Sequence, residues 1–582
     1  MKRILLVLML VLTGFCAQAQ NKLLAPKIDS ITLDYRSSGY ALDSVDVVYG
    51  ANENLRPSGF NLPEFGLNEL LHQRDALGAN LAGFNYLQRQ ASTPILISPL
   101  PYIGFQYSFG GSLTQNLDVQ YSQALSPKTL LNIHYNKKSS DGFLRSSKYA
   151  VNDVNAVLIH RNKHYSTKLD AKYSAYTWSE NGGMSEDSLL QDYIISFTPV
   201  NKSSAESTVK KADISWENYL NLSGDNMIKT GFYQVTRYEV INRLFTDNAP
   251  TQLTDTFYID SNRTRDQYQT ASIKNGAGYF FSSKYFEINA SVNHRYWSNQ
   301  NLNRYFDTTE IFLASELYAG FEKFNLHNTF YFNLVGATGE IKNYTRLQMA
   351  LPLFDLNAKL DINNLYPTPY QRQHYANNFQ WKLTSLSPQQ IITLGGDLKL
   401  KGKLNTGVGV DATTVNNGLY FINNTWRQDT LNTVSAVRIN AFVDYNLGKL
   451  HLSHNLAFNL NSANFNFQPK VISSNRIAYK TPIFKAAKLK MNLGLDLQYL
   501  SEYNSMLYLP EMSLYSPLTG AQSTGNYVLV HAFAAIDLDP FRLFFRAENV
   551  SSLWNDARIR VDEEYPIMPL FVRLGVSWDF FN

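Results

Sequence analysis

The chain has very little cysteine, because only Cys16, close to the N-terminus, occurs among its 582 residues. Cys16 lies in the segment that we predict below to be a cleaved signal peptide, so the mature chain has no cysteine, which excludes disulfides, thiolate metal sites and a cysteine nucleophile. Long apolar runs are also missing beyond the N-terminus. None reaches the ~18 residues of a membrane-spanning helix, which excludes a helical membrane protein. Neither sign of charge dominates, since 52 Lys and Arg balance 48 Asp and Glu, and no basic patch indicates nucleic-acid binding.

Motifs of the common enzyme classes are absent too. The sequence has no G-x-S-x-G, no H-E-x-x-H and no P-loop. The ten histidines are scattered, and His451 and His454 are three residues apart, which on a strand places them on opposite faces. We predict a protein that is not an enzyme and has no metal or cofactor. A catalytic set assembled from distant strands around one histidine, such as His531, is the remaining enzymatic hypothesis.

The N-terminus has the three parts of a secretory signal peptide. Two basic residues precede the apolar run Ile4 to Leu12, and Ala17 and Ala19 form a small-x-small cleavage site. We predict that residues 1–19 are removed after export.

What the sequence does contain is a recurring pattern of about ten residues in which apolar and polar side chains alternate. In the segment Lys488–Tyr499 every second residue from Leu489 is apolar, and lysines and an aspartate occupy the other face. The pattern recurs in Val437–Tyr445, Leu450–Leu460, Tyr527–Leu538, Phe541–Glu548 and Val572–Phe580. These segments are predicted to be strands with different surroundings on their two faces.

A soluble all-β protein is the alternative, because its half-buried strands also alternate. Soluble strands typically run about five or six residues, whereas ~9–11 tilted residues are needed to cross the hydrocarbon core of a bilayer. Tyr (37) and Phe (35) are abundant and cluster near the segment ends, as in the aromatic girdles of membrane barrels. A sheet in lipid must also close on itself, because every backbone N–H and C=O group there needs a hydrogen-bond partner within the protein. We therefore predict an all-β fold, a single large antiparallel transmembrane β-barrel.

Tight turns such as Ser126–Lys128 and Leu447–Lys449 are expected to alternate with long polar connections. The long connections are predicted at residues 179–210, 246–267, 405–432 and 554–569. At roughly 40 residues per hairpin the chain has room for about 18 to 24 strands, in an even number. The predicted parts are the signal peptide (1–19), a short N-terminal segment that is periplasmic or lumenal (20–100), and the barrel (101–582).

Charged residues on the inner face of the predicted strands are the candidate functional groups. By parity, the candidate pore-lining residues are Arg438, Asp444, Lys488, Lys490, Asp496, Asp537, Arg542, Arg546, Glu548, Arg573 and Asp579. One interpretation is that they pair across neighbouring strands and support the wall. The other is that basic and acidic rows create a transverse field that selects solutes. Arg542, Arg546 and Arg573 lie on consecutive strands, so a basic ladder is geometrically plausible.

The segment Asn181–Asp187 in the first long connection has two interpretations as well. It is either a solvent-exposed loop tip or a loop folded inward to narrow a channel.

Several glycine-rich and terminal segments recur in one order along the chain: Leu77–Gly83, Gly142–Tyr165, Asn181–Gly183 and Phe571–Asn582. In this order the chain resembles the putative porin family of outer-membrane barrels of the Bacteroidota. The resemblance implies an integral protein of the outer membrane, with outer-membrane lipid and the barrel-assembly machinery as partners. It implies no catalytic residues. Phe580 and Phe581, just before the last residue, are the expected recognition element for assembly.

The leading functional hypothesis is a passive channel, either a monomer or a homo-oligomer in the form of a trimer, whose water-filled lumen lets small hydrophilic solutes cross the outer membrane. The alternative is a plugged barrel that is a component of a transport or secretion machine, with residues 20–100 as the plug. An energy-coupled receptor needs a sizeable plug domain, and this segment is short for one.

Overall fold

The fold is taken from a computed structural model. It describes residues 100–185, 195–223, 228–250, 257–302, 304–321, 323–402, 404–431, 433–461, 469–483, 489–517, 522–538, 540–554, 560–562 and 564–581. The predicted signal peptide with Ala17 and Ala19, and the predicted N-terminal segment up to residue 99, lie outside the described residues. Within those residues no helix has the length and apolar character to span a membrane.

One antiparallel sheet of 22 strands makes up most of the described chain. Its strands are β1 (Tyr102–Gly110), β2 (Gln115–Ser126), β3 (Thr129–Ser140), β4 (Tyr149–Arg161), β5 (Tyr165–Glu180), β6 (Ala205–Asn221), β7 (Lys229–Asp247), β8 (Thr264–Ser282), β9 (Phe286–Asn301), β10 (Arg304–Phe321), β11 (Phe324–Val335), β12 (Ile341–Ala350), β13 (Phe354–Leu365), β16 (Gln389–Leu400), β17 (Asn405–Asn416), β20 (Val434–Leu447), β21 (Leu450–Asn461), β22 (Val471–Pro482), β23 (Lys490–Leu500), β28 (Tyr527–Leu538), β29 (Phe541–Glu548) and β32 (Phe571–Phe581).

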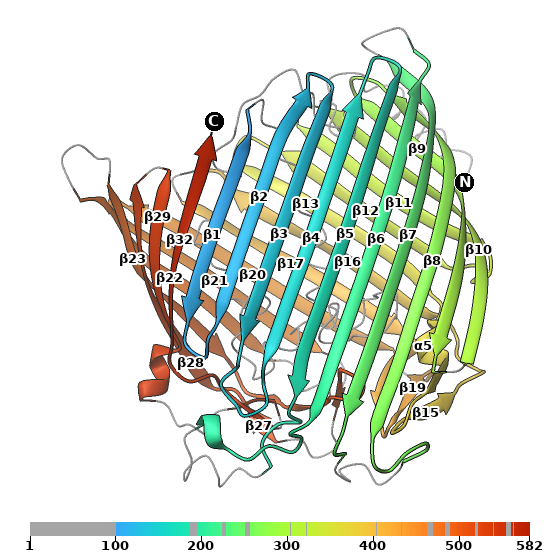
Figure 1. Ribbon diagram of the computed structural model, residues 1–582. Coiled ribbons are helices and arrows are strands. Elements are labelled where there is room, and N and C mark those ends of the chain that lie inside the picture. The colour runs from blue at the N-terminus through green and yellow to red at the C-terminus, as the bar shows by residue number, and fades with distance from the viewer. Residues whose placement is uncertain are drawn as a thin grey trace.

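The sheet closes on itself through its first and last strands (Figure 1). β1 pairs with β32 in a continuous antiparallel register from Tyr102↔Phe581 to Gly110↔Arg573. Closure leaves no edge with unpaired backbone groups, which a β-protein in lipid requires. The predicted single large antiparallel β-barrel is confirmed, and the 22 strands fall in the expected range.

The two faces of the wall differ as the alternation predicts. Apolar side chains of the predicted rows are exposed on the outer face, for example Leu495, Phe545 and Trp578. Their polar neighbours Asp496 and Arg546 are buried on the inner face. Alternate side chains on a strand point to opposite faces, so a sequence period of two places apolar side chains toward lipid and polar side chains toward the lumen.

The two ends of the barrel differ in their connections. Tight turns, such as the residues between β2 and β3 or between β20 and β21, lie at the end where β1 begins and β32 finishes. By the usual asymmetry of such barrels we expect this end to face the periplasm. Long connections lie at the opposite end, at the bottom of Figure 1.

The prediction of a long connection at residues 405–432 is wrong for residues 405–416. Residues 405–416 form β17, which pairs with β16 and β20. Its inner face carries Gly407 and Gly409, and polar groups follow, so the segment resembles a loop in composition. Val408 and Val410 are exposed on the outer face. These alternating valines indicate a strand, although the glycines and polar residues around them suggest a loop.

The long connections contain small elements of their own. These are α5 (Pro369–Arg372), the 3-10 turns η2 (Ile195–Phe197) and η3 (Val550–Leu553), and the strands β14 (Gln373–Tyr375), β15 (Gln380–Lys382), β18 (Gly418–Ile422), β19 (Thr425–Asp429), β24 (Tyr503–Asn504), β25 (Met506–Leu509), β26 (Leu514–Pro517), β27 (Ser523–Thr524), β30 (Arg560–Asp562) and β31 (Tyr565–Pro566). We call the described residues of the connections 366–388, 417–433 and 501–526 the loop cap.

Candidate functional site

The loop cap packs against the inner wall at the long-loop end. Its buried apolar cluster joins the wall strands β4 to β8 to all three cap connections. The wall contributes Tyr149, Val151, Tyr176, Trp178, Val209, Ile241 and Tyr268, and the cap contributes Tyr370, Phe379, Trp381, Leu419, Phe421, Trp426, Leu509, Met512 and Leu514. Burial of so many aromatic rings stabilises the cap against the wall. The barrel mouth at this end is therefore crossed by ordered chain.

The wall here extends past the membrane. β5, β6, β7 and β8 are 16, 17, 19 and 19 residues long, whereas about 9–11 residues span the hydrocarbon core. At the cap end of these strands the outward residues Glu206, Lys210 and Arg265 are charged and exposed, so the cap rests on strand ends that project beyond the hydrocarbon core.

The hairpin β25–β26 spans the lumen. It leaves the wall between β23 and β28, yet its turn contacts β7 on the opposite wall, with β29, β32 and β1 to β6 between them. Arg243 of β7 donates from Nη2 to the carbonyl oxygens of Pro510 (3.2 Å) and Glu511 (2.7 Å) and to Ser513 Oγ (3.1 Å). Arg243, a residue that is 3% exposed, thus fixes the hairpin turn.

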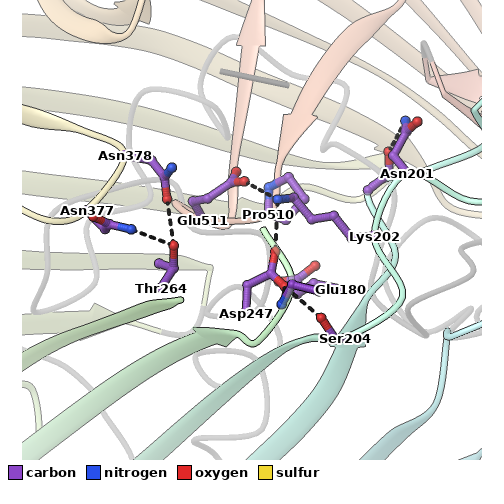
Figure 2. A network of polar contacts seen from close by, with 12 residues as sticks. Glu180, Asn201, Lys202, Ser204, Asp247, Thr264, Asn377, Asn378, Pro510 and Glu511 are labelled. Carbon is purple, nitrogen blue, oxygen red and sulfur yellow. Dashed lines mark hydrogen bonds and ion pairs between the residues drawn. The ribbon is translucent and has the colours of Figure 1, made fainter. Parts of the chain in front are cut away.

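A buried ion-pair network holds the same turn (Figure 2). Lys202 Nζ lies 2.8 Å from Glu511 Oε1 and 3.2 Å from Asp247 Oδ2. Ser204 Oγ donates to Asp247 Oδ1 at 2.8 Å. Burial favours the neutral amine, but the charges of Glu511 and Asp247 outweigh it, so the pKa of Lys202 is raised. Lys202 therefore stays charged and joins two carboxylates from different parts of the chain.

Two further polar contacts anchor the cap to the wall. Tyr508 of the hairpin donates to Glu180 Oε1 at 3.1 Å, at the end of β5. Asn377 donates its backbone N–H to Asp266 Oδ1 (2.8 Å) and its Nδ2 to Thr264 Oγ1 (2.7 Å), both on β8. Figure 2 shows the Asn377–Thr264 contact beside the Lys202 network. The cap is thus held at several points of the wall by directional bonds.

The loop after β5 turns inward. Asn181, Gly182, Gly183 and Met184 are buried, and the Met184 N–H donates to the Glu564 carbonyl at 3.0 Å. Gly183 has φ +77°, and a Cβ there would stand 2.3 Å from Glu564 Cβ, so only glycine fits. Of the two interpretations of this segment, the structure shows the inward one for residues 181–184. Residues 186 and 187 lie outside the described residues.

His374 is buried in the cap between aromatic rings. Its Nδ1 is 3.1 Å from Asn301 Nδ2 of β9, and its ring packs on Tyr370 and Trp381. Burial, aided by the charge of Arg243, lowers the pKa of His374 to about 3. Its neutral form therefore stabilises the cap above pH ~6.5, and this contribution is lost as the pH falls from there toward the folded pKa.

We expect acidification from pH 7 to 5 to weaken the cap by about 2 kcal/mol through His374. Maleimide labelling of a Met512→Cys variant measures cap opening, because Met512 is fully buried. Acid lowers the reactive thiolate fraction equally in Met512→Cys and in Met512→Cys/His374→Phe, which keeps an aromatic ring but does not titrate, so the ratio of the two labelling rates is the readout and should rise from pH 7 to 5. Other buried acids of the cap are common to both variants and cancel in the ratio. Identical pH profiles would contradict this expectation.

Below the cap, the inner face of β5 to β17 carries ion pairs, most of them between neighbouring strands. They include Lys168–Glu217, Lys211–Glu239, Arg237–Asp213, Arg295–Glu310, Arg346–Asp361 and Lys359–Asp411. Some remain open to solvent, since the side chains of Arg237 and Arg346 are 43% and 40% exposed. We call β7 to β13 the open sector of the wall.

The opposite part of the wall is packed and holds most of the predicted charges. Arg476, Asp496, Arg546, Glu548 and Arg573 alternate in sign from β22 to β32, an arrangement we call the charge ladder. Arg476 Nε lies 2.6 Å and Arg546 Nη1 3.0 Å from the Asp496 carboxylate. Glu548 Oε1 lies 3.6 Å from Arg546 Nε and 3.4 Å from Arg573 Nη2. The side chains of Arg546 and Glu548 are each only 2% exposed.

Arg546 and Arg573 are direct cross-strand neighbours, as the predicted basic ladder requires. Carboxylates neutralise both, however, and Arg542 pairs with Asp537 near the short-turn end instead. Pairing across strands, the structural interpretation, therefore describes these groups. A role in lining a pore stays a prediction.

The remaining predicted residues make local contacts. Arg438 Nε donates to Asn440 Oδ1 (3.0 Å), Asp444 Oδ2 accepts from Asn405 Nδ2 (2.9 Å), and Asp579 Oδ1 accepts from Tyr102 OH (2.7 Å). Lys490 stands opposite Asp537 in the register of β23 and β28. Lys488 lies outside the described residues.

His531, the example chosen for an enzymatic hypothesis, is fully buried, and its Nδ1 accepts the Asn549 N–H at 3.1 Å. In the described ranges no three His, Cys, Asp or Glu side chains are placed to hold a metal.

Sequence reasoning did not single out Lys202, Arg243 or Glu511. Arg243 stands between Ile241 and Phe245 on the inner face of β7, so parity from the outward Tyr238 could have placed it. Lys202 and Glu511 lie in connections without a repeat, where no pattern indicates which residues meet.

Comparisons with known proteins agree with the closed barrel. A family model described as putative porin matches residues 68–582. The copper transporter OprC is similar in structure, with a TM-score of 0.61 and 10% identity over 82% of this chain and 80% of its own. The siderophore receptor PirA from Acinetobacter baumannii gives a TM-score of 0.60 and 8% identity over 84% and 81%.

The ferric-catecholate import receptor Fiu from E. coli K12 gives a TM-score of 0.58 and 9% identity over 83% and 82%. At these identities the likeness shows the fold alone. A search of curated proteins finds no match. Because the family model covers most of the chain, the resemblance found in the sequence is confirmed, and the protein belongs to the putative porin family of outer-membrane β-barrels.

Proposed function

We propose that the protein is a channel through which small hydrophilic solutes diffuse passively across the outer membrane, and that the loop cap keeps its resting conductance low. The observation that carries the proposal is the open sector. Its ion pairs face the inside of the barrel and are up to 43% exposed. Charged groups without contact to water are strongly disfavoured, so water must reach them.

The family and the transport proteins that share the fold support a role other than catalysis. Solutes that enter a water-filled lumen need no energy source to move down a gradient. The cap lies across one mouth and is held by the Lys202 and Arg243 contacts, so it limits passage.

Replacing the hairpin Met506–Pro517 by a short glycine-serine linker should raise single-channel conductance in planar bilayers by at least about twofold, because the chain that crosses the lumen is removed. A matched control shortens the turn at 336–339, which joins β11 to β12 at the same end outside the cap. Equal conductance in the wild type, the hairpin variant and the control would contradict a cap that restricts flow.

A plugged transport barrel is the second candidate. Its support is the strand number, because barrels of 22 strands are typical of plugged transporters, whereas aqueous porins have about 16–18. Deleting residues 20–95 tests it. A large current gain from this deletion, with none from removing the hairpin, would favour the plugged barrel over the proposed channel.

A further inference from the structure

Three cations stand side by side on the inner face of the open sector. Arg237 of β7 is opposite Lys274 of β8, and Lys274 is opposite Arg295 of β9. Like charges directly opposite each other on neighbouring strands repel. Such a row needs compensating negative charge, so we ask which of the three cations has a carboxylate partner.

The two arginines are compensated within the wall. Arg237 donates from Nε and Nη2 to both oxygens of Asp213, at 2.8 and 2.6 Å, and its Nη2 also reaches Glu239 at 2.9 Å. Arg295 pairs with Glu310 and stacks its guanidinium 4.4 Å from the centre of the Trp297 ring. Both arginines are held in place and directed at protein groups.

Lys274 is different. In the part of the chain that the structure describes, its ammonium has no ion-pair or hydrogen-bond partner. The acids whose charges act on Lys274 are Asp213 and Glu217, and both are already engaged, Asp213 with Arg237 at 2.6 Å and Glu217 with Lys168 at 3.7 Å. Lys274 is partly exposed on the lumenal face, eight residues before the short-turn end of β8 at Ser282. Its charge is therefore available to a solute in the lumen.

We infer that Lys274, flanked by Arg237 and Arg295, forms a binding site in the lumen for a small oxyanion, a carboxylate or a phosphate. The inference rests on the proposed function, which gives the lumen a solute. An oxyanion would accept a hydrogen bond from the Lys274 ammonium, whose charge the wall leaves uncompensated, and would lie between the two arginines on the neighbouring strands. The predicted basic ladder on β29 and β32 has no counterpart of Lys274, because Arg546 and Arg573 are both paired with carboxylates.

Calorimetric titration of the refolded full-length mature protein with inorganic phosphate, and separately with succinate, tests the site. Lys274→Gln should weaken binding of the preferred anion by about tenfold. Lys274→Arg, which keeps the charge, should stay within threefold of the wild type. The matched control is Lys359→Gln, because Lys359 also faces the lumen but is paired with Asp411 at 2.8 Å. Heat-modifiable gel mobility shows that each variant has folded.

Phosphate binding without succinate binding identifies a phosphate site, and the reverse a carboxylate site; either supports the inference. It is overturned if neither anion binds, if Lys274→Gln binds like the wild type, or if Lys359→Gln loses as much affinity. The conductance of the variant without the hairpin Met506–Pro517 is recorded in parallel. Anion binding without current would uphold the site and contradict the passive channel, whereas current without anion binding would do the opposite.

Discussion

Replacing Arg546 by Met is expected to lower the free energy of unfolding by about 3 kcal/mol. The Arg546 side chain is 2% exposed and lies between Asp496 and Glu548, so its loss leaves two packed carboxylates with less positive charge. Removing one member of a buried pair costs about 3–5 kcal/mol. The lower value is expected here because Arg476 still pairs with Asp496 and Arg573 with Glu548.

Urea unfolding in lipid vesicles, followed by tryptophan fluorescence, measures this loss. The control is Arg346→Met in the open sector. Arg346 pairs with Asp361 but is 40% exposed, so solvent screens the change and the loss should be below about 1 kcal/mol. Equal losses for the two variants would mean that burial does not set the energy of these pairs.

Replacing Lys202 by Met should open the loop cap and leave the barrel folded. The side chains of Lys202, Asp247 and Glu511 are 5%, 1% and 6% exposed, so the variant leaves two carboxylates buried without their shared cation. When the cap opens, water reaches the carboxylates of Asp247 and Glu511. Only contacts of the cap are lost, because the barrel wall stays paired. A loss of about 3 kcal/mol corresponds to a more than 100-fold rise in the open population.

The absence of cysteine after Cys16 makes this measurable. Met512→Cys places one thiol in the cap core, and maleimide labelling then reports opening. We expect at least about 100-fold faster labelling with Lys202→Met. Lys148→Met, which removes a 74% exposed lysine that pairs with Asp141 at 3.7 Å, should change the rate less than about twofold. An unchanged rate in the Lys202 variant would show that the hydrophobic cluster alone closes the cap.

The wall could be predicted because one physical demand repeats along it. Lipid on one face and polar groups on the other impose a period of two. The sequence therefore predicts that Leu495 and Phe545 lie on the outer face and that Asp496 and Arg546 lie on the inner face. The strands Tyr527–Leu538 and Phe541–Glu548 have the predicted bounds. In β17 the outward residues alternate with glycine and threonine, and this composition hides the same period.

By itself, then, the sequence determined the closed barrel, its large strand number and the inner position of the charges, because these follow from local alternation and from the demand for closure. Only the tertiary structure decided which charges meet and which mouth is covered. Arg243 and Ser513 are 270 residues apart in sequence, and their contact crosses the lumen. Lys274 likewise stands between Arg237 and Arg295, whereas Lys359 pairs with Asp411. Cross-strand register and loop packing set such contacts, and neither produces a repeating pattern in the sequence from which it could be predicted.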